Sequence, residues 1–293
     1  MGEIHWGRVL RLSIVALLAV CLFADVFLAW VYVSALIRPG CQPPRPNPAF
    51  PPPQTYTLTS TDGQNIEAWY YPSRNGAAVI ALGGQQGAQG ANLPPVDVLI
   101  ENGYGVLQIG SRACAEPPSI VTLGVKEALD TEAGLEFLLT RSEIDPGRIG
   151  LFGYSMGGVT AIRTAARNEC ITGVLAEGGF YNLGEDFVEP GRKKTLPRAI
   201  FLYTIAGVYW LRTGINPWEI SPIDDLPQIS PSEIFLVYGD KEIGSGRGRE
   251  QYQAAREPKT LWVVPQGAHG FNHLVAPEEY NQRVLEFFNR ALR

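Results

Sequence analysis

The stretch RIGLFGYSMGGVTAIRTAARN, residues 148–168, decides the fold because it passes from an apolar segment through a glycine-rich turn into an alanine-rich segment. Residues 149–152 have the continuous apolar character of a buried strand, and residues 156–167 have the composition of a helix. Between them, Gly153 and Gly157 flank Ser155. A turn this sharp needs glycine neighbours, and it holds the serine hydroxyl away from the sheet.

The pattern G-x-S-x-G around Ser155 is by itself a weak signal, because it arises by chance in roughly one chain of this length in ten. The alternative is a glycine-rich turn without chemistry. A serine alkoxide is not accessible at neutral pH, so a nucleophilic serine needs a neighbouring base. The nucleophile hypothesis therefore depends on a base and an acid elsewhere in the chain.

The candidate base comes from three histidines. His5 lies before a long apolar segment, which leaves His269 and His273 in VVPQGAHGFNH, residues 263–273. This loop follows the last predicted strand, and a loop at the carboxyl end of a strand is where a base would meet the serine turn. We favour His269 and expect a solvated or capping role for His273.

The candidate acid follows another predicted strand, in IFLVYGDKEIGSG, residues 234–246. A carboxylate here could orient the imidazole and stabilise its cation. Asp240 and Glu242 are both available. With either one, the chain order is serine, acid, histidine, and each residue follows a different strand.

The remainder of the region from residue 54 alternates strand and helix patterns, as in an α/β domain. Residues 55–73 alternate apolar and polar residues around Asp62-Gly63, which predicts a hairpin. Short apolar runs predict strands at residues 77–82, 105–109, 149–152, 173–176, 234–238 and 261–264. Helical patterns cover residues 96–101, 126–140, 156–167, 247–255 and 278–292.

These motifs resemble those of α/β-hydrolase-fold serine hydrolases: GYSMGG at 153–158, GDKE at 239–242 and GAHG at 267–270. The chain looks most similar to membrane-anchored relatives of dienelactone hydrolases and prolyl peptidases. The resemblance implies an eight-stranded, mostly parallel sheet with an antiparallel second strand and helices on both faces. In that family the acid commonly ends a Gly-x-x-Asp turn, which places Glu242 rather than Asp240 in the role.

The resemblance also implies an oxyanion hole made of backbone N–H groups. The loop after the third strand often reads His-Gly-x-x-Gly in the family, and here residues 83–87 read GGQQG. Since the donor is a backbone group, the loss of the histidine side chain need not remove it. The expected donors are the N–H groups of Gln85 and Met156.

The N-terminus predicts a membrane helix. After a short tail at residues 1–11, residues 12–37 are apolar except for Asp25 and a few small residues, which is long enough for a signal anchor. Asp25 marks a partner helix or a proton site, or it is tolerated through thinning and hydration of the bilayer, which we favour. Arg8 and Arg11 precede the span, and Arg38 and Arg45 follow it. Because the positive charges on the two sides are nearly balanced, they do not determine which end of the helix faces the cytoplasm. The short tail favours a domain outside the cytoplasm.

A proline-rich linker, residues 38–53, holds eight prolines and predicts an extended spacer before the domain at 54–293. Within that domain, an insertion at about residues 183–227 interrupts the strand rhythm. Residues 196–211 are apolar nearly all round a helix. This segment is either a core helix at the sheet edge or a cap over an apolar substrate pocket, in contact with lipid.

Several classes of function are disfavoured. A net charge of −5 and a pI near 5.4 argue against a nucleic-acid surface. The four cysteines have no metal-ligand spacing, and neither a metal nor a cofactor is expected. Cys114 and Cys170 could pair if the domain faces an oxidising compartment.

The sequence therefore predicts a single-pass membrane serine hydrolase that cleaves carboxylic ester or thioester bonds through an acyl-enzyme, with Ser155, His269 and Glu242 as its triad. The expected substrate is a small or lipid-like acyl compound. The alternatives are a serine peptidase of the same fold and a non-catalytic binding or scaffold protein.

Overall fold

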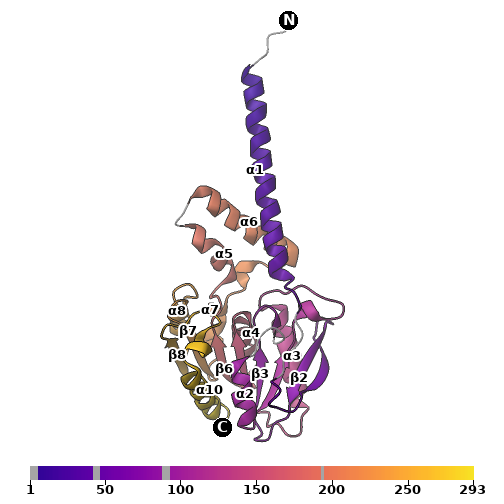
Figure 1. Ribbon diagram of the computed structural model, residues 1–293, viewed down its shortest axis with the longest axis vertical. Coiled ribbons are helices and arrows are strands. Elements are labelled where there is room, and N and C mark those ends of the chain that lie inside the picture. The colour runs from indigo at the N-terminus through magenta and orange to yellow at the C-terminus, as the bar shows by residue number, and fades with distance from the viewer. Residues whose placement is uncertain (1–5, 42–46, 88–92, 193–194) are drawn as a thin grey trace. The chain divides into compact units, whose positions relative to one another are not determined.

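The computed structural model describes residues 6–41, 47–87, 93–192 and 195–293 of the chain (Figure 1). They form two compact units. The sheet unit contains residues 37–183 and 220–293, and the helical unit contains residues up to 36 together with residues 184–219.

An eight-stranded sheet forms the centre of the sheet unit, with the strand order β1-β2-β4-β3-β5-β6-β7-β8. Strand β2 is antiparallel to both of its neighbours, and the other pairs are parallel. The predicted eight-stranded, mostly parallel sheet with an antiparallel second strand is therefore confirmed. The strands are β1 (Gln54–Thr59), β2 (Asn65–Tyr71), β3 (Ala78–Leu82), β4 (Gly105–Ile109), β5 (Ile149–Tyr154), β6 (Ile171–Glu177), β7 (Glu233–Gly239) and β8 (Lys259–Val264).

Helices cover both faces of this sheet, as predicted (Figure 1). Successive side chains of a strand point to opposite faces, so Leu151 and Phe152 of β5 enter two different apolar cores. Helices α3 and α4 contribute to the first core, and α2 and α10 to the second. The helices of this unit are α2 (Pro94–Glu101), α3 (Lys126–Leu139), α4 (Met156–Ala165), α7 (Pro222–Asp225), α8 (Gly248–Ala254), α9 (Asn272–Val275) and α10 (Pro277–Ala291), with short 3₁₀ turns η2 (Arg112–Cys114) and η4 (Leu226–Gln228).

The helical unit consists of α1 (Trp6–Ile37), α5 (Leu183–Arg192), α6 (Leu196–Thr213) and η3 (Pro217–Glu219). Helix α1 is long and apolar enough to cross a membrane, although a signal sequence would have the same properties. Helix α6 covers the apolar segment at residues 196–211. It belongs to the unit that contains α1 and not to the sheet unit.

The linker contacts the sheet unit on both sides of residues 42–46, which lie outside the described part of the chain. One residue before the linker, at the end of α1, the Ile37 carbonyl accepts a hydrogen bond of 2.8 Å from the Val121 N–H. After residues 42–46, the Asn47 amide donates to Asp97 at 2.8 Å, and Phe50 packs against the core beside α2 and α10. The described ends of the predicted spacer are thus held against the folded chain.

A disulfide joins Cys41 to Cys114, with 5.1 Å between their Cα atoms. The possible pair between Cys114 and Cys170 is therefore wrong, and Cys170 is a free thiol. The reason is topological. Cys114 lies in the loop after β4, close to the linker, whereas Cys170 lies between α4 and β6.

We expect Cys41→Ser to lower the free energy of unfolding by about 2–4 kcal/mol, because the bond closes a long loop of the unfolded chain. Urea unfolding of the full chain in detergent micelles measures this loss. Cys170→Ser is the matched control and should leave the midpoint near that of the wild type. Alkylation of Cys114 in the unfolded, unreduced chain would contradict the assignment.

Candidate active site

The turn that holds Ser155 joins β5 directly to α4. Ser155 has φ 56° and ψ −121°, a conformation that L-residues rarely adopt. A Cβ added to Gly153 would collide with the Gly157 carbonyl, and one added to Gly157 would collide with the Leu82 carbonyl. Both positions therefore require glycine, and the predicted sharp turn around Ser155 is present.

The structure brings Ser155, His269 and Glu242 together from the ends of three strands. His269 Nε2 lies 2.9 Å from Ser155 Oγ, and His269 Nδ1 lies 2.8 Å from Glu242 Oε2. Asp240 is exposed and instead accepts a hydrogen bond of 2.9 Å from the Gln266 N–H. Of the two candidate carboxylates, Glu242 is thus the one that contacts the imidazole.

The charges in this chain of contacts fix the protonation that the site favours. Burial by itself raises the pKa of Glu242, but hydrogen bonds to the carboxylate, first among them that from His269, outweigh it and lower the pKa below its ordinary value. The Glu242 hydrogen bond raises the pKa of His269 above its ordinary value of 6.5, and burial opposes part of that rise. An anionic Glu242 places the proton on Nδ1 and leaves Nε2 free to accept the serine proton.

A second buried carboxylate lies beneath the imidazole and was not predicted. Glu177, at the end of β6, is 5% exposed and accepts a hydrogen bond from the Tyr280 hydroxyl. The Asn272 amide bridges the two acids, because it donates to Glu177 at 2.9 Å and to Glu242 at 3.2 Å. Burial raises the pKa of Glu177, although its hydrogen bonds oppose the rise. The available sequence signal was the position of Glu177, directly after the predicted strand 173–176.

The loop after β3 contacts the serine turn, as an oxyanion loop would. A Cβ added to Gly84 would lie 3.6 Å from Ser155 Cβ, so even the smallest side chain at this position would contact the serine. The Gly87 N–H closes the loop on the Gly84 carbonyl at 2.8 Å. Gln85 follows Gly84 in the chain, and Met156 is the first residue of α4, whose N-terminus favours negative charge. Both expected donors therefore belong to segments that adjoin Ser155.

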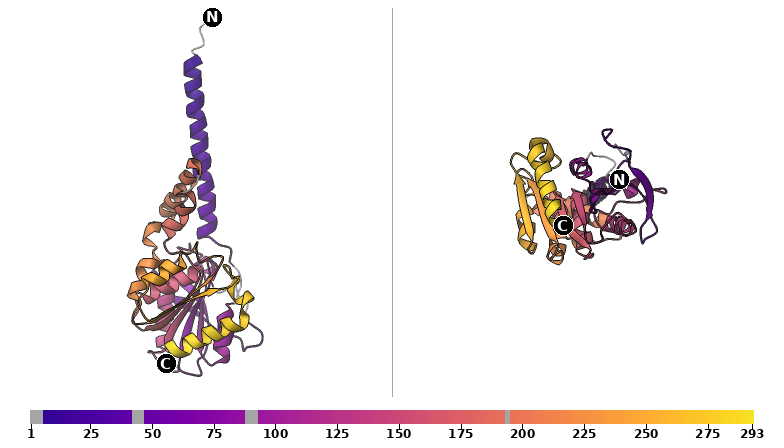
Figure 2. Two further views of the ribbon diagram at one scale, coloured as in Figure 1. Left: turned by 90° about the vertical axis from the view of Figure 1, so that its left-hand side faces the viewer. Right: turned by 90° about the horizontal axis from the view of Figure 1, so that it is seen from below.

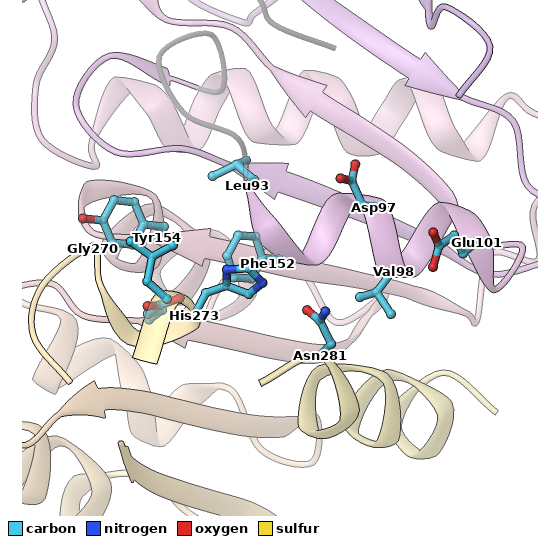
Figure 3. A pocket seen from close by; sticks show the side chains of 11 residues that line it. Leu93, Asp97, Val98, Glu101, Phe152, Tyr154, Gly270, His273 and Asn281 are labelled. Atoms are coloured by element: carbon cyan, nitrogen blue, oxygen red, sulfur yellow. The ribbon is translucent and has the colours of Figure 1, made fainter. Parts of the chain in front are cut away.

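A pocket of about 620 Å³ opens beside the site (Figure 3). Tyr154 and Gly270 line it, whereas their chain neighbours Ser155 and His269 do not, and the Tyr154 ring lies 5.1 Å from that of His269. Its walls combine apolar and acidic side chains from α2, β5, α9 and α10. They include Leu93, Val98, Phe152, Leu274, Asp97, Glu101 and Asn281.

His273 lines this pocket, and His269 is the histidine that contacts Ser155 and Glu242. The His273 ring packs edge-on against Tyr280, with 5.4 Å between the ring centres, and burial lowers its pKa below the ordinary value. His5 lies outside the described residues. Among the residues that the structure describes, no group of three or more His, Cys, Asp or Glu side chains is placed to hold a metal ion.

Comparison with known proteins identifies the fold. No protein-family model matches the chain. The chain is 24% identical over 254 residues to the uncharacterized protein YfhR of Escherichia coli K12, covering 82% of this chain and 81% of that protein. Its structure is similar to that of the Pyrococcus furiosus esterase Pf2001, with a TM-score of 0.67 and 23% identity over 88% of this chain and 99% of the esterase.

A second solved structure is a larger enzyme, the acylaminoacyl peptidase of Pyrococcus horikoshii. The match has a TM-score of 0.64 and 18% identity, and it covers 82% of this chain but 41% of the peptidase. A third solved structure, the alpha/beta hydrolase GrgF of Penicillium sp. sh18, matches with a TM-score of 0.65 and 17% identity over 83% of this chain and 99% of that chain. The chain therefore has the α/β-hydrolase fold.

Proposed function

We propose that the chain is a membrane-anchored serine hydrolase that cleaves carboxylic ester or thioester bonds through an acyl-enzyme. The observation that carries the proposal is the unbroken chain of contacts from Ser155 through His269 to Glu242, at 2.9 and 2.8 Å. These distances are within the range needed for a proton to pass between nucleophile and base.

In the first half-reaction, His269 Nε2 takes the Ser155 proton while Oγ attacks the substrate carbonyl carbon. The oxyanion of the tetrahedral intermediate accepts hydrogen bonds from the N–H groups of Gln85 and Met156. The intermediate then collapses to the acyl-enzyme and expels the alcohol or thiol, which leaves with the proton held by His269.

In the second half-reaction, water replaces the leaving group. His269 removes a proton from the water, whose oxygen attacks the acyl carbon, and Ser155 regains its proton as the carboxylic acid departs. Glu242 stays anionic throughout and stabilises the imidazolium formed in each half. These steps use only groups of the chain and the substrate.

The pocket beside Ser155 supports an acyl substrate with an apolar chain. Leu93, Val98 and Phe152 offer apolar surface, and the volume of about 620 Å³ falls in the range of pockets that hold small molecules. An acyl chain entering past Tyr154 would bury its methylene groups against these side chains, with a gain of about 0.8 kcal/mol for each group.

We further propose that α1 anchors the chain and that the sheet unit lies outside the cytoplasm. The disulfide between Cys41 and Cys114 supports this orientation, because such bonds persist in oxidising compartments and are rare in the cytosol. Arg8 and Arg11 then lie on the cytoplasmic side of the span.

A fluorophosphonate probe tests the nucleophile. We expect the wild-type chain to be labelled and Ser155→Ala to remain unlabelled, because an activated serine displaces fluoride from the probe and is phosphonylated. On p-nitrophenyl esters, the wild type should prefer medium or long acyl chains to acetate. A folded wild-type chain that is unlabelled and inert would instead favour the binding or scaffold alternative, and faster turnover of peptide amides than of esters would favour a peptidase.

The pH profile of kcat/KM tests the roles of His269 and Glu242. Since His269 must be neutral to accept a proton and its pKa is raised, activity should fall as pH drops through a value above 6.5. Glu242→Gln removes the group that raises this pKa, so the acidic limb should move to lower pH while kcat/KM drops by about a hundredfold or more. Asp240→Asn is the matched control and should keep the wild-type profile. The opposite pattern would transfer the acid role to Asp240.

A further inference from the structure

The outward face of α6 carries an apolar stripe, formed by Leu196, Ile200, Tyr203, Trp210 and Leu211. Their relative exposures run from 50% to 77%. The spacing of i, i+4, i+7, i+14 and i+15 places all five on one side of a helix. Gly207, at i+11, falls on the same side and adds no polar group. The stripe therefore extends along the length of α6.

The opposite face of α6 is already buried. Ile205, Ala206, Val208 and Tyr209 are covered, and the Tyr209 ring lies 5.6 Å from that of Phe187 in α5. A helix on the surface of a water-soluble unit has polar residues opposite its buried face. Helix α6 has a second apolar face instead. Among the described residues, the Trp218 ring stacks on Tyr203 with 6.5 Å between the ring centres, and all five residues of the stripe are still at least half exposed.

Helix α6 lies beside the second half of α1 (Figure 2). The Thr204 hydroxyl donates to Asp25 at 2.6 Å. Eight residues further along α6, Arg212 donates to the Ser34 hydroxyl at 2.6 Å. Its guanidinium carbon lies over the Trp30 ring, 4.2 Å from the ring centre. The residue numbers rise together on the two helices, from Thr204 and Asp25 to Arg212 and Ser34, so α6 runs parallel to α1.

We infer that α6 is itself bound to the lipid bilayer next to α1, with the apolar stripe against lipid. The inference rests on the proposed anchoring of the chain by α1. The surface of α1 around the contact is also apolar and exposed, as at Phe23, Phe27 and Val31, so the stripe continues the surface that α1 offers to lipid. Exposed apolar patches of this extent are rare on soluble proteins and mark interaction sites.

The chemistry of the stripe and of the helix contact favours lipid over a protein partner. Trp210, which lies two residues before Arg212 and thus near the Ser34 end of the span, is of a residue type enriched where membrane and water meet. In an apolar helix, the Asp25 carboxyl needs a hydrogen-bond partner from the protein when water is absent, and Thr204 provides it. The membrane-bound part of the chain then consists of two helices that lie far apart in the sequence.

Fluorescence quenching by lipid tests this contact. Ile200→Cys and Leu211→Cys are made in the full chain with Cys21→Ser and Cys170→Ser, labelled with nitrobenzoxadiazole and reconstituted into phosphatidylcholine vesicles that contain nitroxide-labelled lipid. We expect the lipid to quench both labels by about half, with blue-shifted emission, as for side chains within the acyl region. Glu136→Cys, on the exposed side of α3 in the sheet unit, is the control and should stay unquenched.

Quenching of both labels no greater than that of the control would overturn the inference, as would crosslinking of the labelled face to a second copy of the chain. Carbonate extraction and fluorophosphonate labelling of the same vesicles separate the two proposals. If the chain stays in the membrane and reacts with the fluorophosphonate but the labels on α6 are not quenched, only the inference about α6 fails. If carbonate extracts the chain from the membrane, the proposed anchoring fails and the inference fails with it. The double variant Asp25→Cys/Thr204→Cys should form an internal crosslink, and its absence in folded, active chain would also count against the pairing.

Discussion

The site depends on one steric constraint, the absence of any room for a Cβ at Gly153 and Gly157. Because Gly157 packs against the Leu82 carbonyl, the start of α4 and the end of β3 approach closely, and the loop after β3 comes within reach of the serine. The same approach forces Ser155 into its rare backbone conformation, at φ 56°. Strain at this residue is tolerated because a parallel sheet and two apolar cores fix the segments on either side of it. Ser155, the loop after β3 and the N-terminus of α4, to which we assign the nucleophile and the oxyanion hole, are thus positioned by one close approach of two backbone segments.

A second constraint concerns the buried acids under His269. Two carboxylates this near each other repel, and each would be unfavourable without hydrogen bonds to protein groups. The Gly239 N–H and the Asn272 amide stabilise Glu242 as an anion, while Glu177 has a raised pKa and a partner in Tyr280. The asymmetry gives the imidazole one firmly charged neighbour. Since Asn272 and Tyr280 lie on α9 and α10, the last helices of the chain also help to hold the acid in place.

Most of the fold was predictable because the strands are short apolar runs between glycine-rich turns, a local property of the sequence. His269 and Glu242 were predictable as candidates for a related reason, since each lies in the loop that follows such a run. The bridge through Asn272 was not, because nothing local distinguishes a buried asparagine that links two strand ends from one that caps a helix. The partner of Cys114 was equally hidden. Cys41 lies in a proline-rich segment that reads as a solvated spacer, and only the packing of the chain brings it to the loop after β4.

The sequence alone predicts that residues 196–211 form an apolar helix, but the position of this helix could be found only from the structure. A helix that is apolar on every side has to be covered on every side, and the sequence could not say by what. The structure covers one side with α1 and α5 and leaves the other exposed, and the lipid beside α1 is the apolar environment that we infer for the exposed side. Asp25 points to the same conclusion. An isolated acid in an apolar span can be tolerated by hydration, but an acid bonded to Thr204 of a second apolar helix joins the two within one low-dielectric environment. Both helices therefore require the same surroundings.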